Sequence, residues 1–174
     1  MFNHTLVSAT ISESFLKYSG FQHYESQPRP VFTLDVYPLN WLSVGAYYSF
    51  HQSISEISGS KYKTTGGRLA FHAYPVFKWT KLNYFKDHVD VYLAANVQQD
   101  ITEYLTYTDY DPETWEKIVL DKPVVFRQNH LYTGFSLGLS YYVIKNVGVN
   151  IEYSKIGYSF SYTEYLKAGI IFRL

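Results

Sequence analysis

Ionisable side chains recur at intervals along segments in which polar and apolar residues alternate, and they fall on the polar side of the alternation. The set comprises Asp35, Arg68, His72, Asp90, Glu152, Lys167 and Arg173. Three acids and three bases would balance, with a histidine beside them. Because buried charges must be paired, we predict a structural ionic network that fills a narrow interior. The functional alternative is a path for protons or ions.

A second group of candidate residues lies in the acidic segment DYDPETWE, which carries Asp109, Asp111 and Glu113. Carboxylate oxygens are hard ligands that suit calcium, but their spacing is not that of a known calcium loop. A solvated loop is therefore the preferred interpretation. The six histidines are scattered without a pair at metal-ligand spacing. We expect neither a metal site nor a cofactor.

The elements that must position these side chains are segments with a period of two. Residues 89–98, for example, place Val91 and Leu93 on one side and Asp90 and Tyr92 on the other. The expected strands are 5–17, 30–37, 42–51, 65–74, 89–98, 130–142, 147–154 and 163–174. Such alternation is typical of strands with two different faces, and no segment indicates a helix. The sequence therefore predicts an all-β protein with an eight-stranded antiparallel up-and-down barrel.

The predicted connections differ between the two ends of this barrel. Tight turns are expected at 37–41 and 143–146, where Pro and Asn occur, and a longer connection at 75–88 lies at the same end. Longer polar links at the opposite end are 19–29, 52–64 and 101–128, with a short one near 155–161. The link 101–128 could extend strands five and six beyond a membrane. An even number of strands places both termini at the short-turn end.

The composition limits the classes of protein to consider. A chain of 174 residues is the size of one domain, taken as 1–174. Charged residues make up 17% of it, against about 25% in typical soluble domains. The zero net charge argues against nucleic acid as a partner. No apolar run is long enough for a transmembrane helix, and the first residues lack the features of an export signal. For an exported protein, we expect the numbering to describe a mature or re-engineered chain.

The identity of the polar face decides which side of the barrel faces inward. A soluble lipocalin-like carrier has its apolar face inside, whereas a membrane barrel has it outside. A solvated face should be rich in Lys and Glu, but here it is mostly Gly, Ser, Ala, Asn and Tyr. We therefore predict that the apolar face contacts lipid and the small polar residues fill the interior.

Aromatic residues gather near the predicted strand ends, as expected for girdles at two membrane interfaces. Those at the short-turn end are Tyr37, Trp41, Tyr74, Trp79 and Tyr141. Those at the other end are Tyr48, Phe50, Tyr104, Tyr153 and Tyr162.

The final strand, AGIIFRL, resembles the terminal strand of bacterial outer-membrane barrels, and the hairpin VYPLNWLSVGAYYSF looks like that of small OmpA/OmpX-type barrels. The resemblance implies the outer membrane of a Gram-negative bacterium, with both termini on the periplasmic side. It also implies that Gly169, Phe172 and Leu174 form the signal read by the barrel-insertion machinery. In that family the strand commonly ends on an aromatic residue, whereas this chain ends on Leu174 with Phe172 two positions before it.

An enzymatic alternative follows from a second resemblance, to the lipid A deacylases, which are also eight-stranded outer-membrane barrels. They carry His-x-Ser on the penultimate strand followed by a Glu. Ser154 and Glu164 echo this layout, but Glu152 stands where the histidine is needed, so the hydroxyl lacks a base. The other His-x-Ser, His51 and Ser53, lies on the third strand, where that family has none.

The leading functional hypothesis is a non-enzymatic outer-membrane barrel without catalytic residues. It would act through its extracellular loops or as a subunit of a larger outer-membrane assembly. The expected partners are outer-membrane lipid, lipopolysaccharide, the insertion machinery during assembly and possible other outer-membrane proteins. The deacylase-like enzyme and the soluble carrier are the two alternatives.

Overall fold

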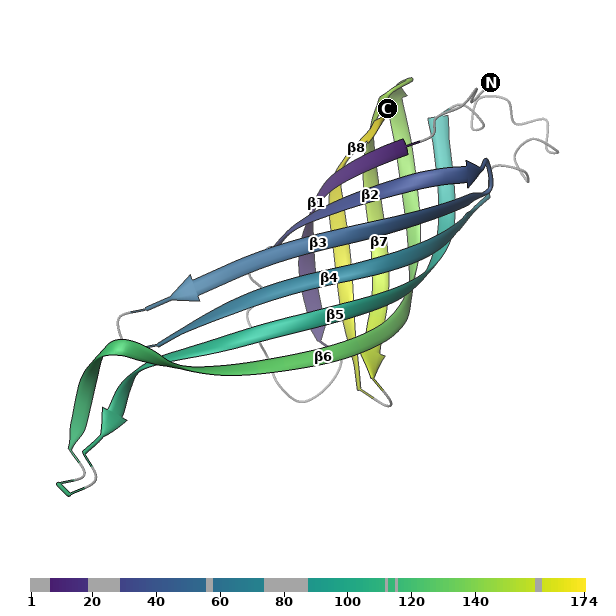
Figure 1. Ribbon diagram of the computed structural model, residues 1–174. Coiled ribbons are helices and arrows are strands. Elements are labelled where there is room, and N and C mark those ends of the chain that lie inside the picture. Colours follow the sequence, from purple (N-terminus) through teal and green to yellow (C-terminus); the bar gives the residue numbers. More distant parts are fainter. Residues whose placement is uncertain are drawn as a thin grey trace.

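The chain folds into a closed ring of eight antiparallel strands, as predicted (Figure 1). The computed structural model describes residues 7–18, 29–55, 58–73, 88–111, 113–114, 116–158 and 161–174. The strands are β1 (Val7–Tyr18), β2 (Arg29–Leu39), β3 (Leu42–Ile54), β4 (Ser58–His72), β5 (Val89–Tyr110), β6 (Lys117–Ile144), β7 (Val147–Tyr158) and β8 (Ser161–Arg173). Each pairs with its neighbours in sequence, and β8 pairs with β1 to close the barrel.

The apolar residues of the alternating pattern face outward. Leu93, Leu137 and Ile170 are 53%, 54% and 50% exposed, whereas Ala94 and Ser136, next to the first two in sequence, are almost fully buried. Leaving this many large apolar side chains in water would forgo the hydrophobic stabilisation of about 25 cal/mol per Å². A hydrocarbon environment removes that penalty, and closure leaves no strand edge within it. The predicted orientation, with the apolar face toward lipid, is confirmed.

The interior is filled by large polar side chains that lie against glycines on the neighbouring strand. Tyr47 of β3 pairs with Gly66 of β4, and Tyr92 of β5 pairs with Gly138 of β6. A Cβ atom at either glycine would overlap the ring of its tyrosine partner. The small residues predicted for the inner face therefore make room for tyrosines from the adjacent strand, and the bore is packed.

Four strands continue beyond the barrel at the end opposite the termini. β5 has 22 residues and β6 has 28, against about 9–11 that a tilted strand needs to cross hydrocarbon. Residues 50–54, 58–63, 100–110 and 117–131 form this continuation, which we name the sheet extension, and Figure 1 shows its β5–β6 hairpin projecting away from the ring. The expectation that 101–128 could prolong two strands is borne out.

The prediction of a loop at 52–64 is wrong, because β3 runs to Ile54 and β4 begins at Ser58. Polar residues such as Gln52 and Lys61 pair across the two strands there. Outside lipid both faces of a sheet can meet water, so the alternation that marks a half-buried strand disappears while the backbone pairing continues.

The barrel starts and ends at the same end. Ser8 at the start of β1 pairs with Arg173 at the end of β8. The β2–β3 turn at 40–41 and the β6–β7 turn at 145–146 lie at this end, which we call the turn end. In the described ranges, no helix has the length and apolar character required to cross a membrane.

Candidate functional site

Four of the predicted interior charges form one connected group across the bore. Arg68 of β4 donates through Nε to Oδ1 of Asp35 at 2.8 Å and through Nη1 to Oε2 of Glu152 at 2.7 Å. Lys167 of β8 donates to Oε1 of Glu152 at 2.7 Å, and the Tyr92 hydroxyl donates to Oε2 at 2.7 Å. Two positive and two negative groups, each at least nine-tenths buried, thus pair with one another. The group joins β2, β4, β7 and β8 through the centre of the barrel.

The remaining members of the predicted network lie nearer the turn end. Asp90 accepts from His72 Nδ1 at 2.9 Å, and His72 Nε2 lies 2.9 Å from the hydroxyl of Ser43. The His72 ring is held between Tyr37 and Tyr92, with ring centroids 5.0 Å and 5.5 Å away. The structure therefore divides the predicted network into two groups.

The second group has the connectivity of a serine–histidine–aspartate relay, which sequence reasoning missed because it did not include Ser43. With Asp90 accepting from Nδ1–H, Nε2 is left to accept the Ser43 proton, as in an activated nucleophile. Ser43 is fully buried, however, and His72 is 6% exposed, so a substrate carbonyl has no approach to the hydroxyl. The arrangement is therefore a structural one, in which three buried polar side chains satisfy one another's hydrogen bonds. A signal was present, since Ser43, His72 and Asp90 all stand on the polar side of their strands near the turn end.

Arg173 lies on the inner face of β8 as predicted, whereas Tyr37 is placed differently from the sequence prediction. The Arg173 guanidinium lies 3.4 Å from the centroid of the Tyr142 ring. Tyr37 was expected at the lipid interface, and this is wrong: its hydroxyl lies 3.2 Å from that of Ser8, and its ring packs on His72. Val36 points outward, so the next residue points inward even at the strand end.

The other predicted interface aromatics face outward where the structure describes them. They are Trp41, Tyr48, Phe50, Tyr104, Tyr141, Tyr153 and Tyr162, each 38–44% exposed. Tyr104 is the exception, because it lies on the sheet extension, on the side that continues the inner wall of the barrel. Tyr74 and Trp79 lie outside the described residues.

The predicted insertion signal lies at the turn end of the barrel, in the last residues of β8 and in Leu174, which follows the strand. Gly169 pairs with Ser12 of β1, and a Cβ atom there would overlap the β1 backbone. Phe172 pairs with Ala9, and Leu174 is 75% exposed, with its N–H donating to the Val7 carbonyl at 3.0 Å. Their role in insertion stays a prediction.

The residues that echo the deacylase layout do not come together. Ser154 is buried on the inner face, where its hydroxyl donates to Glu152 at 2.9 Å. Glu164 has the opposite phase on β8 from the inward-facing Lys167, so it lies on the outer face of the wall. His51 and Ser53 share the inner face of β3 near its outer end.

The acidic segment forms the tip of the sheet extension. Oδ1 of Asp111 accepts the backbone N–H groups of Glu113 at 2.8 Å and Thr114 at 3.1 Å. These hydrogen bonds favour the carboxylate and lower the pKa of Asp111. Its charge therefore stabilises the turn. Among the described residues, no three acidic, histidine or cysteine side chains are grouped so as to hold a metal ion.

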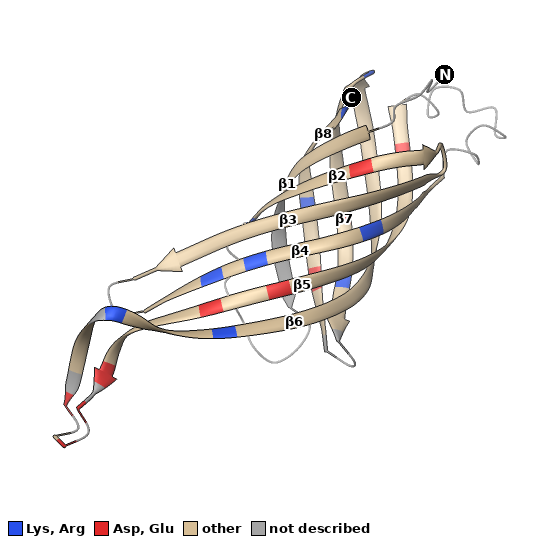
Figure 2. Cartoon of the chain, in the orientation of Figure 1, with Lys and Arg blue, Asp and Glu red and all other residues tan. Residues whose placement is uncertain are grey.

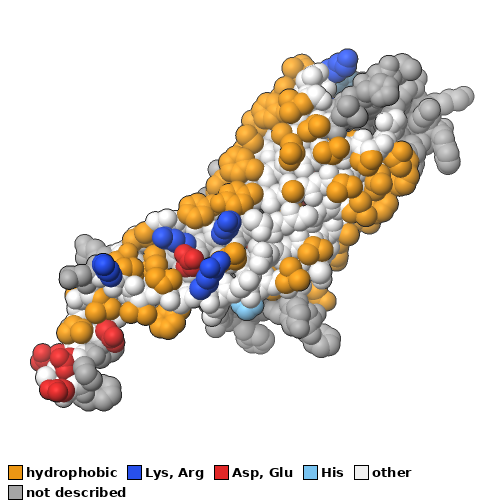
Figure 3. All heavy atoms as spheres, viewed as in Figure 1, with side chains coloured by type: hydrophobic (Ala, Val, Ile, Leu, Met, Phe, Trp, Pro, Cys, Tyr) orange, Lys and Arg blue, Asp and Glu red, His pale blue; other side chains and the backbone are white. Residues whose placement is uncertain are grey.

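Three cations stand on the outer wall at the base of the sheet extension, and we name Lys61, Lys63 and Arg127 the basic belt. Register places Lys61 beside Glu103, and Glu103 beside Arg127. Figures 2 and 3 show basic residues gathered where the strands leave the ring, with acidic residues close to them. Within the described part of the chain, no carboxylate lies within ion-pair distance of these three cations. The belt marks the boundary between the apolar wall and the extension.

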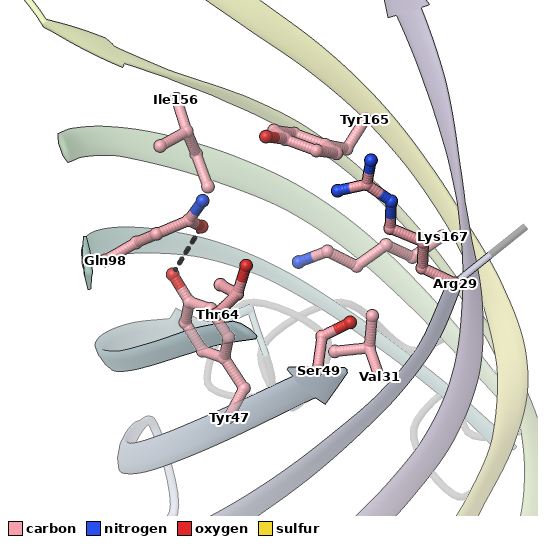
Figure 4. Close-up of a pocket in the computed structure, with 9 residues that line it drawn as sticks. All are labelled: Arg29, Val31, Tyr47, Ser49, Thr64, Gln98, Ile156, Tyr165 and Lys167. Atoms are coloured by element: carbon pink, nitrogen blue, oxygen red, sulfur yellow. Dashed lines mark hydrogen bonds between the residues drawn. The ribbon is translucent and has the colours of Figure 1, made fainter. Parts of the chain in front are cut away.

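A small cavity remains in the outer half of the bore (Figure 4). Its volume is about 30 Å³, which holds no more than a few water molecules. Arg29 and Lys167 point toward it, and the Tyr47 hydroxyl donates to Gln98 at 3.1 Å beside it. On the side of this cavity nearer the turn end, the connected group of Asp35, Arg68, Glu152 and Lys167 fills the interior. Where the described residues line the bore, it is filled by paired charged side chains, and this charged lining excludes the soluble carrier.

Comparison with known proteins identifies the fold. No protein-family model matches the chain, and no curated protein matches it in sequence. Among solved structures, the chain is similar to the N-terminal β-barrel domain of Pseudomonas aeruginosa OprF, with a TM-score of 0.59 at 10% identity over 95% of each chain. It is also similar to Neisserial surface protein A, with a TM-score of 0.58 at 15% identity over 97% of this chain and 96% of the other.

A third structure, the Yersinia pestis attachment invasion locus protein Ail, gives a TM-score of 0.51 at 12% identity over 95% of this chain and 96% of that one. Ring closure, an apolar outer wall and these likenesses agree. The chain thus has the fold of the small OmpA/OmpX-type outer-membrane β-barrels.

Proposed function

We propose that this chain is an integral outer-membrane protein of a Gram-negative bacterium whose closed barrel anchors a recognition surface outside the cell. The sheet extension is that surface, and the protein acts without catalysis, either alone or as a subunit of a larger outer-membrane assembly. The observation that carries the proposal is apolar exposure on the extension. Val119, Val125 and Phe126 are 75%, 51% and 61% exposed at positions beyond the basic belt.

The filled interior supports this assignment, because the described residues of the bore leave little room for a transport path. The group of Asp35, Arg68, Glu152 and Lys167 fills the bore with paired charges, and the hydrogen-bonded Ser43–His72–Asp90 relay fills it nearer the turn end. The part of the molecule that remains available for recognition is the sheet extension. Exposed apolar side chains on a rigid strand pair are characteristic of a protein interaction site.

The basic belt supports an orientation with the extension outside and both termini in the periplasm. Lys61, Lys63 and Arg127 lie on the outer side of the sheet extension, where the strands leave the barrel. In a barrel that spans the membrane, we expect these cations at the depth of lipid head groups. Lipopolysaccharide phosphates in the outer leaflet would meet these cations as charge-assisted partners. Ail has been solved with the heparin analogue sucrose octasulfate, a polyanion bound to a barrel of similar fold.

Site-specific photo-crosslinking in intact cells tests the recognition surface. A photoreactive residue at Val119 or Phe126 should give a discrete protein adduct of higher mass, because both side chains are presented to a partner. The matched control is Leu93, 53% exposed but on the lipid-facing wall. If Val119 and Phe126 yield no adduct beyond that of Leu93, the extension is not a docking surface.

Lipid A from cells with and without the protein tests the non-enzymatic part of the proposal. We expect identical acyl-chain masses, because Ser154 and Glu164 stand on opposite faces of the wall. Loss of an acyl chain only when the protein is present would contradict it.

A further inference from the structure

A groove of about 320 Å³ lies at the β3–β4 turn, against β5. Most of its lining faces the side of the sheet extension that continues the inner wall of the barrel, opposite the basic belt. Its volume is at the lower end of the roughly 300–1,000 Å³ range of small-molecule sites. It is separate from the small cavity of the bore but adjoins β6, because Tyr104 and Leu105 of its lining pair with Phe126 and Val125.

The polar lining of the groove is made of hydroxyl groups and carries no charge. Five of its nine described lining residues are serine or threonine, and none is Lys, Arg, Asp or Glu. Ser55 and Ser58 are already engaged with each other, with Ser55 Oγ donating to the Ser58 carbonyl at 2.8 Å. Ser53, Ser60 and Thr106 make no hydrogen bond to another side chain in the part of the chain that is described. Each can therefore donate and accept one toward a ligand.

Two tyrosine rings provide the apolar part of the groove. Tyr62 pairs with Thr102 and Tyr104 pairs with Ser60, so the two tyrosines are diagonal neighbours on adjacent strands. Tyr62 is held in place, with the Arg29 guanidinium 4.5 Å from its ring centroid and the His51 ring 6.4 Å away. Tyr104 is 40% exposed. The pair offers aromatic surface at little cost in side-chain entropy, because tyrosine has only two side-chain torsions.

This combination matches the chemistry of a sugar ring, which has an apolar C–H face and a rim of hydroxyls. The rings can cover the C–H face while Ser53, Ser60 and Thr106 exchange hydrogen bonds with the rim. No described lining residue is a cation, and the Arg29 guanidinium beside the groove already lies on the Tyr62 ring, so the lining favours a neutral ligand over an anionic one. A lipid tail would leave the hydroxyls unsatisfied. We propose that the groove binds a neutral oligosaccharide. The inference rests on the proposed function, which places the extension outside the cell.

A glycan array probed with the purified full-length barrel in detergent tests this assignment. The array carries neutral and acidic oligosaccharides, and we expect retention on a neutral subset. Titration of the best neutral oligosaccharide should then show that Tyr104→Ala weakens binding by at least about tenfold, as removal of a central aromatic contact does. Tyr62→Ala should act in the same direction.

The matched control is Tyr162→Ala, since Tyr162 is 44% exposed but lies on β8, outside the groove. It should bind as the unaltered protein does, and a heat-dependent gel shift checks that each variant is folded. Absence of retention on any neutral glycan, or equal binding by folded Tyr104→Ala, overturns the sugar site. Crosslinking from Val119 does not depend on the groove, so its outcome separates failure of the sugar site from failure of the proposed function.

Discussion

At the scale of single residues, two adjacent glycines on β4 lie on opposite faces of the barrel wall. Gly66 faces the packed interior, and Gly67 faces outward. A Cβ atom at Gly66 would overlap the Tyr47 ring, whereas at Gly67 the nearest atom is the Gly45 carbonyl oxygen at 3.8 Å. Gly66→Ala should therefore lower the free energy of unfolding by about 1–3 kcal/mol through overpacking. Gly67→Ala should be neutral or slightly stabilising. Urea unfolding in lipid vesicles measures both, and equal effects would argue against a tightly packed bore.

The charge group at Arg68 gives a second prediction at this scale. Arg68→Met leaves Asp35 and Glu152 buried without their guanidinium, so we expect a loss of about 3–5 kcal/mol in the free energy of unfolding. Arg127→Met, on the exposed outer wall, should change the same quantity by less than about 0.5 kcal/mol. A small effect at Arg68 would show that water reaches both carboxylates.

The sequence predicted which charges lie inside but not how they pair. Asp35, Glu152 and Lys167 are on the polar side of their strands, and alternation alone places them there. That Arg68 bridges Asp35 and Glu152 depends on the stagger between strands, which no local pattern records. The prediction for Tyr37 was wrong because it relied on the preference of tyrosine for a membrane interface. Its position in the alternation of β2 places its side chain on the inner face.

At the scale of elements, the strands within lipid were predictable and their continuations were less so. Alternation is enforced only where one face meets hydrocarbon. β5 therefore loses it after residue 100 and β6 shows it only from about residue 130, while the pairing of the two strands continues to Tyr110 and Lys117. The groove was missed for the same reason. Its serines, around Ile54 and Gly59, looked like a polar loop, although these two residues pair across adjacent strands.

The basic belt carries the prediction that belongs to this scale. Replacing Lys61, Lys63 and Arg127 together by Gln should weaken binding of the barrel to lipopolysaccharide, by about 1 kcal/mol for each charge removed at low salt. The difference should shrink as ionic strength rises, because exposed charges are screened. Lys145→Gln, in an exposed turn at the opposite end, is the control. Co-sedimentation with lipopolysaccharide measures the effect. Unchanged binding would show that the basic belt does not contribute to lipopolysaccharide binding.

At the scale of the whole molecule, the described residues form a barrel with a filled centre. We expect no steady channel conductance when the protein is inserted in a planar bilayer, because the Asp35–Arg68–Glu152–Lys167 group crosses the bore. Addition of detergent alone is the control. A reproducible unitary conductance that is absent from this control would contradict a sealed interior. It would favour the alternative hypothesis of a path for protons or ions.

The orientation of the wall underlies every assignment, and site-directed spin labelling tests it directly. The chain has no cysteine, so single cysteines can be introduced at Leu93, Leu137 and Val119 without a background. In vesicles, labels at Leu93 and Leu137 should be relaxed by oxygen and shielded from a water-soluble nickel chelate, while a label at Val119 should show the reverse. Nickel access at Leu93 and Leu137 equal to that at Val119 would contradict a lipid-facing apolar wall.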